Sequence, residues 1–175
     1  MKRIIAFAGL PGVGKSTISQ AVSTPLGAVI IDIDQFKKVA VDAKLVKEQI
    51  DPPEVRWMYY QASLEHAVAL FDQGTTNIIM DEVFHVQSLR TKFETYCTER
   101  QIQVMWVEVT CSYEVVEARL KVKGREGHIL STDEALAMHL RFKELFEPFE
   151  EGQCILLDNT NGVEPLVSVL LDALR

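Results

Sequence analysis

The chain has 175 residues, of which 25% are charged, and a formal net charge of −7 at pH 7. This length suits a single domain with one core, and the negative charge argues against a protein that grips nucleic acid or an anionic membrane through bulk electrostatics. No apolar stretch approaches the roughly 18 residues that span a bilayer, so we expect a cytoplasmic protein without a membrane segment. Cys97, Cys111 and Cys154 have neither disulfide nor zinc-ligand spacing, which favours reduced thiols.

Short apolar runs rich in β-branched residues alternate along the chain with segments of helical spacing. The runs are 4–8, 29–33, 77–80, 104–109 and 154–157, and the helical segments are 15–23, 53–71, 86–100, 113–121, 132–146 and 163–174. Such runs suit strands buried on both faces. Their alternation with helices predicts an α/β fold, a parallel sheet covered by helices on both faces, in one domain over 1–175. Asp51-Pro52-Pro53 is expected to end one helical region and begin the next.

The segment from Gly9 to Ser16 fits the pattern G-x-x-x-x-G-K-[ST] between a strand-like run and a helix-like one. Glycines let consecutive backbone N–H groups turn toward one bound anion, and the following helix N-terminus adds a favourable dipole. Lys15 can reach the terminal phosphates of ATP, and the Ser16 hydroxyl is placed for Mg²⁺. The residues expected to bind ATP here are Gly9, Pro11, Gly12, Val13, Gly14, Lys15, Ser16 and Thr17. The motif predicts a nucleoside triphosphate site without saying what happens to the triphosphate.

Carboxylates follow two of the predicted strands. Asp32 and Asp34 lie two residues apart in IIDIDQFKK and would share a face of extended chain. A phosphoryl acceptor needs a base that orients and deprotonates its hydroxyl, and Asp34 is our candidate for that base. Asp32 is a candidate for the water shell of Mg²⁺, and Asp81, which follows the run NIIM, is a second one. A helix cap is the competing interpretation of each of these carboxylates.

The stretch RLKVKGREG gathers Arg119, Lys121, Lys123 and Arg125 in an otherwise acidic chain. Cationic side chains neutralise the charge that develops during phosphoryl transfer, and a segment that closes over a site excludes water. We therefore predict a small lid over about 119–131, with a solvated charged face as the alternative. Lys37 and Arg56 lie where an acceptor would be covered, and both could equally be solvated helix positions.

The motifs GLPGVGKST, IDIDQFKK, IIMDEVF and RLKVKGREG, in this order and spacing, resemble those of the small P-loop kinases of metabolite-kinase type. The nearest likeness is to the branch that holds chloramphenicol phosphotransferase, zeta toxin and polynucleotide kinase. This resemblance covers almost the whole chain and implies the three-layer P-loop nucleoside triphosphate hydrolase fold, with a five-stranded parallel sheet in the order 2-3-1-4-5. It also implies that the loop binds ATP.

The resemblance assigns roles to particular residues. It implies that Asp34 is the catalytic aspartate and that Lys37 lies near the acceptor. It places Arg119 and Arg125 at lid positions that contact the nucleotide and the transferred phosphate, so that Lys15, Asp34 and Arg125 are the expected catalytic residues. It also makes LLDNTNG, at 156–162, look like the loop that borders adenine. Asp32-x-Asp34 is similar to a shikimate kinase motif, but the glycine triplet and acceptor arginines of that family are missing.

The hypothesis from the sequence is a Mg²⁺-dependent ATP phosphotransferase that acts on a hydroxyl of a small molecule. Lys37 and Arg56 are the candidate acceptor-binding residues, and Ser16, Asp32 and Asp81 are the candidate metal-binding ones. The first alternative is a P-loop ATPase or nucleotide-dependent switch with no acceptor. The second is a polynucleotide 5′-hydroxyl kinase, which the charge of −7 makes less favourable because nucleic acid is then an unlikely partner. The sequence does not indicate a protein partner.

Overall fold

A five-stranded, all-parallel sheet forms the centre of the computed structural model, which describes residues 1–40, 50–122 and 131–174. The strands are β1 (Lys2–Ala8), β2 (Ala28–Asp32), β3 (Asn77–Asp81), β4 (Ile102–Thr110) and β5 (Cys154–Asp158). They lie in the order β2-β3-β1-β4-β5, so the predicted fold class and strand order are confirmed. No helix in these described ranges is long and apolar enough to cross a membrane.

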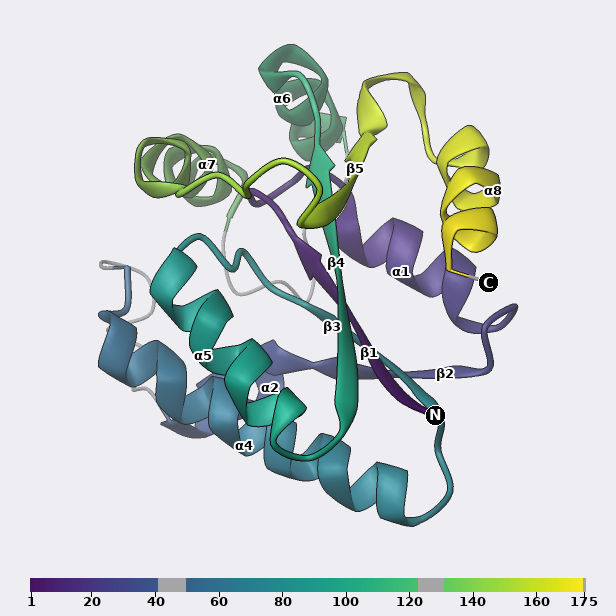
Figure 1. Cartoon of the computed structure of the whole chain (residues 1–175). Coiled ribbons are helices and arrows are strands. Elements are labelled where there is room, and N and C mark those ends of the chain that lie inside the picture. The colour runs from purple at the N-terminus through teal and green to yellow at the C-terminus, as the bar shows by residue number, and fades with distance from the viewer. Residues whose placement is uncertain (41–49, 123–130, 175) are drawn as a thin grey trace.

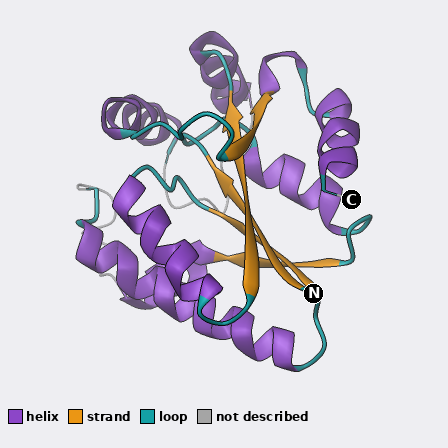
Figure 2. Ribbon diagram, in the orientation of Figure 1, coloured by secondary structure: helices purple, strands orange, loops and turns teal. Residues whose placement is uncertain are grey.

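Helices cover both faces of this sheet (Figures 1 and 2). They are α1 (Lys15–Ser23), α2 (Ile33–Ala40), α4 (Pro53–Asp72), α5 (Gln87–Thr98), α6 (Tyr113–Val122), α7 (Thr132–Leu145) and α8 (Glu164–Ala173), with a short 3₁₀ turn η1 (Asn159–Asn161) after β5. Figure 1 shows α1 and α8 on one side of the sheet and α2, α4 and α5 on the other. α4 begins at Pro53, as predicted, whereas the predicted end of a helical region at Asp51 follows residues 41–49, which lie outside the described residues.

Alternate residues of β1 enter two separate hydrophobic cores. Ile4 and Ala6 pack with residues of α4 and α5, whereas Ile5 and Phe7 pack with residues of α1, α6 and α8. All four side chains are fully buried. Because a parallel strand with helices on both faces has no polar side, it reads as a continuous apolar run, which is why these strands could be located from the sequence.

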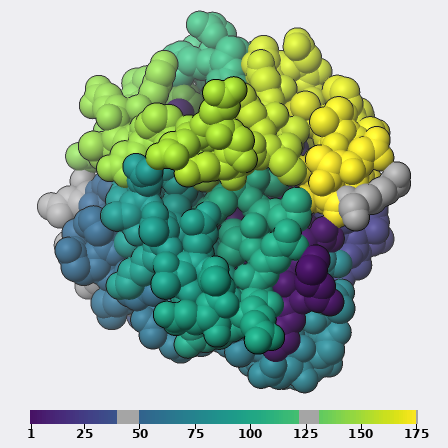
Figure 3. Space-filling model, in the orientation of Figure 1, coloured from purple at the N-terminus to yellow at the C-terminus, as the bar shows by residue number. Residues whose placement is uncertain are grey.

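The segment that follows α7 lies across one end of α5 (Figure 3). Arg90 of α5 donates to the backbone carbonyls of Glu147 and Pro148 at 2.9 and 3.1 Å, and its guanidinium lies 4.2 Å from the centre of the Phe149 ring. Glu147 N–H donates to the carbonyl of His85 at 2.9 Å. These contacts connect the end of α7 to the loop that follows β3, at the carboxyl edge of the sheet.

Strand register determines which residues meet at that edge. Asp81 at the end of β3 is paired with Phe7 of β1 on one side and with Asp32 of β2 on the other. The loop after Ala8 therefore begins beside Asp81, and Asp32 lies one strand further along the same edge. In an open α/β sheet, ligands bind outside the carboxyl ends of the strands where the strand order reverses, and β1 occupies that position here.

Candidate active site

The loop from Gly9 to Gly14 joins β1 to α1, and all three of its glycines, including Gly12 with φ 85°, have a positive φ. Gly9 has φ 140° and Gly14 has φ 99°, both in the region that side chains with a Cβ avoid. A Cβ on Gly9 would lie 2.3 Å from the carbonyl oxygen of Val109, and one on Gly14 would lie 2.3 Å from Asn159 Nδ2. The glycines therefore allow the loop to pack directly against the ends of β4 and β5.

This loop offers backbone donors to an anion. Among the described residues, the amides of Gly12, Gly14, Lys15 and Ser16 donate no hydrogen bond to the protein, whereas Thr17 N–H donates to Gly14 at 3.1 Å. Ser16 and Thr17 are exposed in the first turn of α1. Free N–H groups at a helix N-terminus carry positive partial charge, so the geometry fits a phosphate-binding loop.

Lys15 lies across the loop that precedes it. Its Nζ donates to the carbonyls of Gly9 at 2.8 Å and Leu10 at 3.2 Å. Burial lowers the pKa of Lys15, while Asp81, Glu82 and Asp34 act in the opposite direction and favour its charged form. These three carboxylates, which lie at or just after the ends of β2 and β3, therefore stabilise the charged ammonium group against the effect of burial.

Asp32 and Asp34 are not on one extended strand, and that part of the sequence interpretation is wrong. The strand ends at Asp32 and α2 begins at Ile33. Asp32 accepts from the backbone N–H of Asp34 at 3.0 Å and from Gln35 Nε2 at 2.9 Å, so the helix-cap alternative for Asp32 is confirmed. Any role of Asp32 toward a metal ion would have to coexist with this cap.

Asp34 lies in the first turn of α2 and keeps contact with solvent. The surrounding protein raises the pKa of Asp34 from 3.8 to about 6, first by desolvation and then through the charges of Glu82, Asp32 and Asp81, against the opposing effect of Lys37. A carboxyl group whose pKa approaches neutrality is better matched to proton transfer than an ordinary aspartate is. This is the electrostatic property expected of a general base.

Two ion pairs lie next to Asp34. Lys37 Nζ is 2.8 Å from Asp51 Oδ2, and Arg56 Nη1 is 2.6 Å from Glu82 Oε1. Arg56 Nε also donates to the carbonyl of Asp51 at 3.2 Å, which links the two pairs. We call Asp34, Lys37, Asp51, Arg56 and Glu82 the polar cluster.

Arg56 is one of the most buried residues of the chain. Its side chain is 1% exposed, so the solvated-position alternative for Arg56 is wrong. Its guanidinium also lies 5.2 Å from the centre of the Phe142 ring. Burial would lower the pKa of Arg56, but Glu82 and the adjacent tyrosines raise it overall. Burial alone would raise the pKa of Glu82, but Arg56 lowers it overall, so the pair is charged on both sides.

The sequence interpretation missed several members of this environment. Asp51 appeared only as part of a helix boundary, yet it is 6% exposed and also accepts from Tyr59 Oη at 3.3 Å. His85, in the loop after β3, belongs to no motif in the sequence and is 5% exposed. Burial lowers the pKa of His85 to about 4, so its ring is neutral at pH 7. Glu82 also follows the run NIIM, but the sequence favours Asp81 as the functional carboxylate because Asp81 comes directly after that run.

The turn after β5 contacts the phosphate loop. Asn159 is fully buried, and its Nδ2 donates to the carbonyl of Val13 at 2.8 Å. Arg119 Nη2 donates to the carbonyl of Asn159 at 2.8 Å. The segment predicted to border adenine and the arginine predicted to contact the nucleotide are thus brought to one end of the loop. Arg125 and most of the predicted lid, 119–131, lie outside the described residues.

His139 of α7 contacts the phosphate loop from the opposite side. Its Nδ1 is 2.8 Å from the carbonyl oxygen of Pro11, and the side chain is almost fully buried. A carbonyl can only accept, so Nδ1 carries the hydrogen. This bond connects the helix that follows the predicted lid to the loop itself.

We predict that His139→Leu weakens MgATP binding about 5- to 10-fold, because the Pro11 carbonyl of the loop loses its donor. His139→Asn should restore most of the affinity, since an asparagine amide can replace Nδ1, whereas His139→Gln should not. The measurement is the dissociation constant of a fluorescent ATP analogue, with urea unfolding as the control for stability. Equal affinity in all three variants would contradict this role.

The residues at this edge of the sheet could hold a magnesium ion that is already bound to a nucleotide. The described residues include no group of three or more His, Cys, Asp or Glu side chains that could hold a metal ion by themselves. Mg²⁺ bound to a nucleotide needs only one or two protein groups, because phosphates and water supply the other ligands. The exposed hydroxyl of Ser16 and the carboxyl of Asp81 at the end of β3 fit that requirement.

The sheet order and the loop define the fold of the small P-loop kinases, as the likeness seen in the sequence implies. The chain belongs to the AAA domain family, whose model matches residues 4–148. Comparison with curated proteins gives no match.

Solved structures similar to the chain include three kinases. A sugar kinase from Janibacter sp. HTCC2649 has a TM-score of 0.78 at 22% identity, covering 99% of this chain and 95% of that one. A gluconokinase from Sinorhizobium meliloti 1021 has a TM-score of 0.73 at 20% identity, with coverages of 97% and 90%. An APS kinase from Mycobacterium tuberculosis, in complex with AMPPNP and APS, has a TM-score of 0.66 at 16% identity, with coverages of 99% and 97%. At these identities the similarity shows the fold alone.

Proposed function

We propose that the protein is a Mg²⁺-dependent kinase that transfers the γ-phosphate of ATP to a hydroxyl group of a small molecule. The observation that carries this proposal is the position of Asp34 in the first turn of α2, directly after β2 at the carboxyl edge of the sheet. Burial first, and then Glu82, Asp32 and Asp81, raise the pKa of Asp34 to about 6, and Glu82 and Asp81 also favour the charged form of Lys15 in the phosphate loop. A base and a phosphate-binding lysine thus belong to one electrostatic environment. The names of the similar sugar kinase and gluconokinase agree with a small acceptor.

Each residue has a defined task in this reaction. The loop amides and Lys15 bind the β- and γ-phosphates, and Arg119 lies beside the nucleotide. Asp34 accepts the proton of the acceptor hydroxyl while the acceptor oxygen bonds to the γ-phosphorus and the bond to the β-phosphate oxygen breaks, which leaves ADP and a phosphoester. Mg²⁺, held by Ser16 with Asp81 or Asp32 in its water shell, would neutralise phosphate charge. Arg125 of the predicted lid is the further candidate for stabilising the transferred charge.

The acceptor-dependence of ATP consumption tests this function. ATP consumption should be slow alone and rise strongly with one class of hydroxylated metabolite, in a screen of sugars, polyols, nucleosides and antibiotics. A fast, acceptor-independent hydrolysis would favour the ATPase or switch alternative. Transfer to the 5′ end of a short single strand, with strong salt dependence, would instead favour the polynucleotide kinase alternative.

The pH dependence of phosphoryl transfer should show the protonation of Asp34. Because the pKa of Asp34 is raised to about 6, its carboxylate form is lost as pH falls through that value, and kcat/KM should fall about tenfold per pH unit below it. If the aspartate had its ordinary pKa, kcat/KM would begin to fall only near pH 4. The measurement is kcat/KM for the acceptor between pH 4.5 and 8, at saturating MgATP and about constant ionic strength. A rate that stays flat down to pH 5 would contradict the assignment.

A further inference from the structure

The cations of the polar cluster are already neutralised by carboxylates of this chain. Lys37 is paired with Asp51, and these side chains are 16% and 5% exposed. Arg56 is paired with Glu82, and these are 1% and 13% exposed. Lys15 donates to the carbonyls of Gly9 and Leu10 in the phosphate loop. Among the described residues of the cluster, none of the cationic side chains is free to pair with a negatively charged acceptor.

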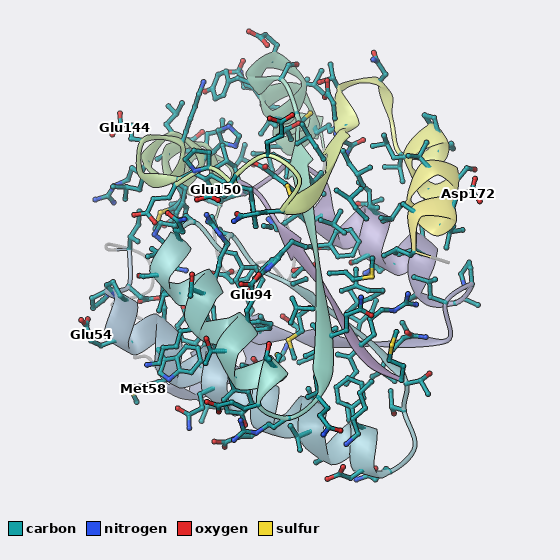
Figure 4. The ribbon with its side chains drawn as sticks, in the orientation of Figure 1. Glu54, Met58, Glu94, Glu144, Glu150 and Asp172 are labelled. Atoms are coloured by element: carbon teal, nitrogen blue, oxygen red, sulfur yellow. The ribbon has the colours of Figure 1, made fainter. Side chains whose placement is uncertain are left out.

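Breaking either ion pair so that its cation could bind an acceptor would also be unfavourable. Releasing Arg56 to an acceptor would leave Glu82 almost buried without its principal partner, which is strongly unfavourable. The same holds for Asp51 if Lys37 turned away, because Asp51 is 5% exposed. Figure 4 labels acids on outer helix surfaces, among them Glu54, Glu144 and Asp172. These side chains are exposed to water, so their charge is solvated and burial does not penalise it as it does for Glu82 and Asp51.

Carboxylates outnumber cations around Asp34. Among the described residues, the carboxylates here are Asp34, Asp51 and Glu82 of the polar cluster with Asp81 and Asp32 nearby, and the cations are Lys15, Lys37 and Arg56. An acceptor with a carboxylate or phosphate group would therefore be repelled when Asp34 is in the form that accepts a proton. Hydroxyl groups can donate to these oxygens, and an ammonium group can pair with them.

Neutral hydrogen-bonding groups adjoin Arg56. His85 Nδ1 is buried and has no hydrogen-bond partner within the described part of the chain. Tyr60 Oη is buried beside Arg56, which lowers the pKa of the phenol against the larger effect of burial. The His85 ring is neutral because burial, with Arg56 nearby, lowers its pKa to about 4. Neutral groups of this kind can hydrogen-bond a hydroxyl or a water, and they add no positive charge that would attract an anion.

We propose that the acceptor is a polyhydroxylated compound with no negatively charged group, either uncharged or bearing an amine, and that the Lys37–Asp51 and Arg56–Glu82 pairs enforce this selectivity. The inference rests on the proposed kinase function and names the substrate class of the same site. Arg56 is then a positioning residue that holds Glu82, rather than a residue that touches the acceptor.

The test compares acceptors built on one carbon skeleton. Glucitol, glucosamine, gluconate and glucose 6-phosphate form one set, and the corresponding pentose compounds form another. With MgATP, kcat/KM for phosphoester formation should be at least about 10-fold higher for the uncharged or amino member than for the acid or phosphate member of its set. Higher salt should narrow this ratio, because it screens the repulsion.

Two variants test the ion pairs directly. Glu82→Gln releases the charge of Arg56, and Asp51→Asn releases that of Lys37, so each should raise the ratio of acid to neutral turnover by about 10-fold. The matched control is Glu99→Gln, which removes the partner of Arg100 in an exposed pair 3.5 Å long and should leave the ratio unchanged. A variant that folds poorly would have lower turnover with every acceptor, but its ratio of acid to neutral turnover would not change. If one of the two variants does not fold, the other is sufficient for the test.

The outcomes separate this inference from the function on which it rests. Equal or faster transfer to the acid or phosphate members, or a ratio that neither variant moves, would overturn the inference and leave the kinase function standing. An absence of transfer to every acceptor, in a protein that binds MgATP, would contradict the kinase function, and the inference would fall with it.

Discussion

The variant Asp34→Asn is expected to lose phosphoryl transfer by about 100- to 10,000-fold, the usual contribution of a general base. Asparagine keeps the size of the side chain and removes its ability to take a proton, so MgATP affinity should stay close to that of the natural chain. The measurements are kcat with a responsive acceptor and the dissociation constant of a fluorescent ATP analogue. Full turnover in this variant would remove Asp34 from the mechanism.

The same variant should not lose stability. In the folded chain the pKa of Asp34 is raised to about 6 from 3.8, so its ionised form is disfavoured by folding. Above pH 6 this carboxylate therefore opposes folding, and the opposition disappears as pH falls below about 4. The amide of the Asp34→Asn variant carries no such charge, and we expect a Tm equal to or above that of the natural chain at pH 7, with the difference vanishing at acid pH.

A matched control isolates the position from the chemical change. Asp72→Asn makes the same substitution at a side chain that is 65% exposed at the end of α4, where it pairs with Lys2 at 2.8 Å. This variant should keep both turnover and ATP affinity. A comparable loss of turnover in Asp72→Asn would show that the effect of Asp34→Asn is not specific to the candidate site.

The variant Arg56→Met is expected to lower the free energy of unfolding by about 3–5 kcal/mol at pH 7, because it leaves a buried carboxylate without its principal cation. Arg56 lowers the pKa of Glu82, so in the natural chain this pair stabilises the fold above the ordinary pKa of a glutamate, and the stabilisation is lost as pH falls through the lowered value. In the variant, burial of Glu82 raises its pKa instead. The stability deficit should therefore shrink as the pH is lowered from 8 to 5, in urea unfolding experiments.

Two further variants show whether the ion pair causes this loss. The double variant Arg56→Met/Glu82→Met should be more stable than Arg56→Met, because it removes the unpaired charge as well. Arg100→Met breaks a surface pair whose side chains are 40% and 66% exposed, and it should cost only about 0–1 kcal/mol. If Arg56→Met and Arg100→Met were equally stable, the buried Arg56–Glu82 pair would contribute no more to stability than a surface pair does.

The fold was predictable because its signals are local. Buried parallel strands such as β1 read as apolar runs, and the loop from Gly9 to Gly14 carries conformational and contact requirements that only glycine meets. The wrong interpretation of Asp32 and Asp34 arose where two local patterns compete. The alternation in IIDID suits a strand, but Asp32 also caps a helix that begins one residue later.

The polar cluster could not be predicted because its pairs form only in the folded chain. Arg56 and Glu82 are 26 residues apart in the sequence and lie on a helix and just after a strand. Nothing in the neighbours of Arg56 along the chain shows that its charge will be buried. Asp51 likewise presents itself as the residue before two prolines, and its pairing with Lys37 depends on how α2 packs against α4.

The fate of the γ-phosphate tests the central claim most directly. The protein is incubated with Mg²⁺, γ-labelled ATP and the acceptor that gives the strongest response, and the label is followed into phosphoester and inorganic phosphate. The kinase function predicts that ATP loss and phosphoester formation are equal, and that Asp34→Asn abolishes both. Label that appears as inorganic phosphate at the same rate with and without the acceptor would contradict it.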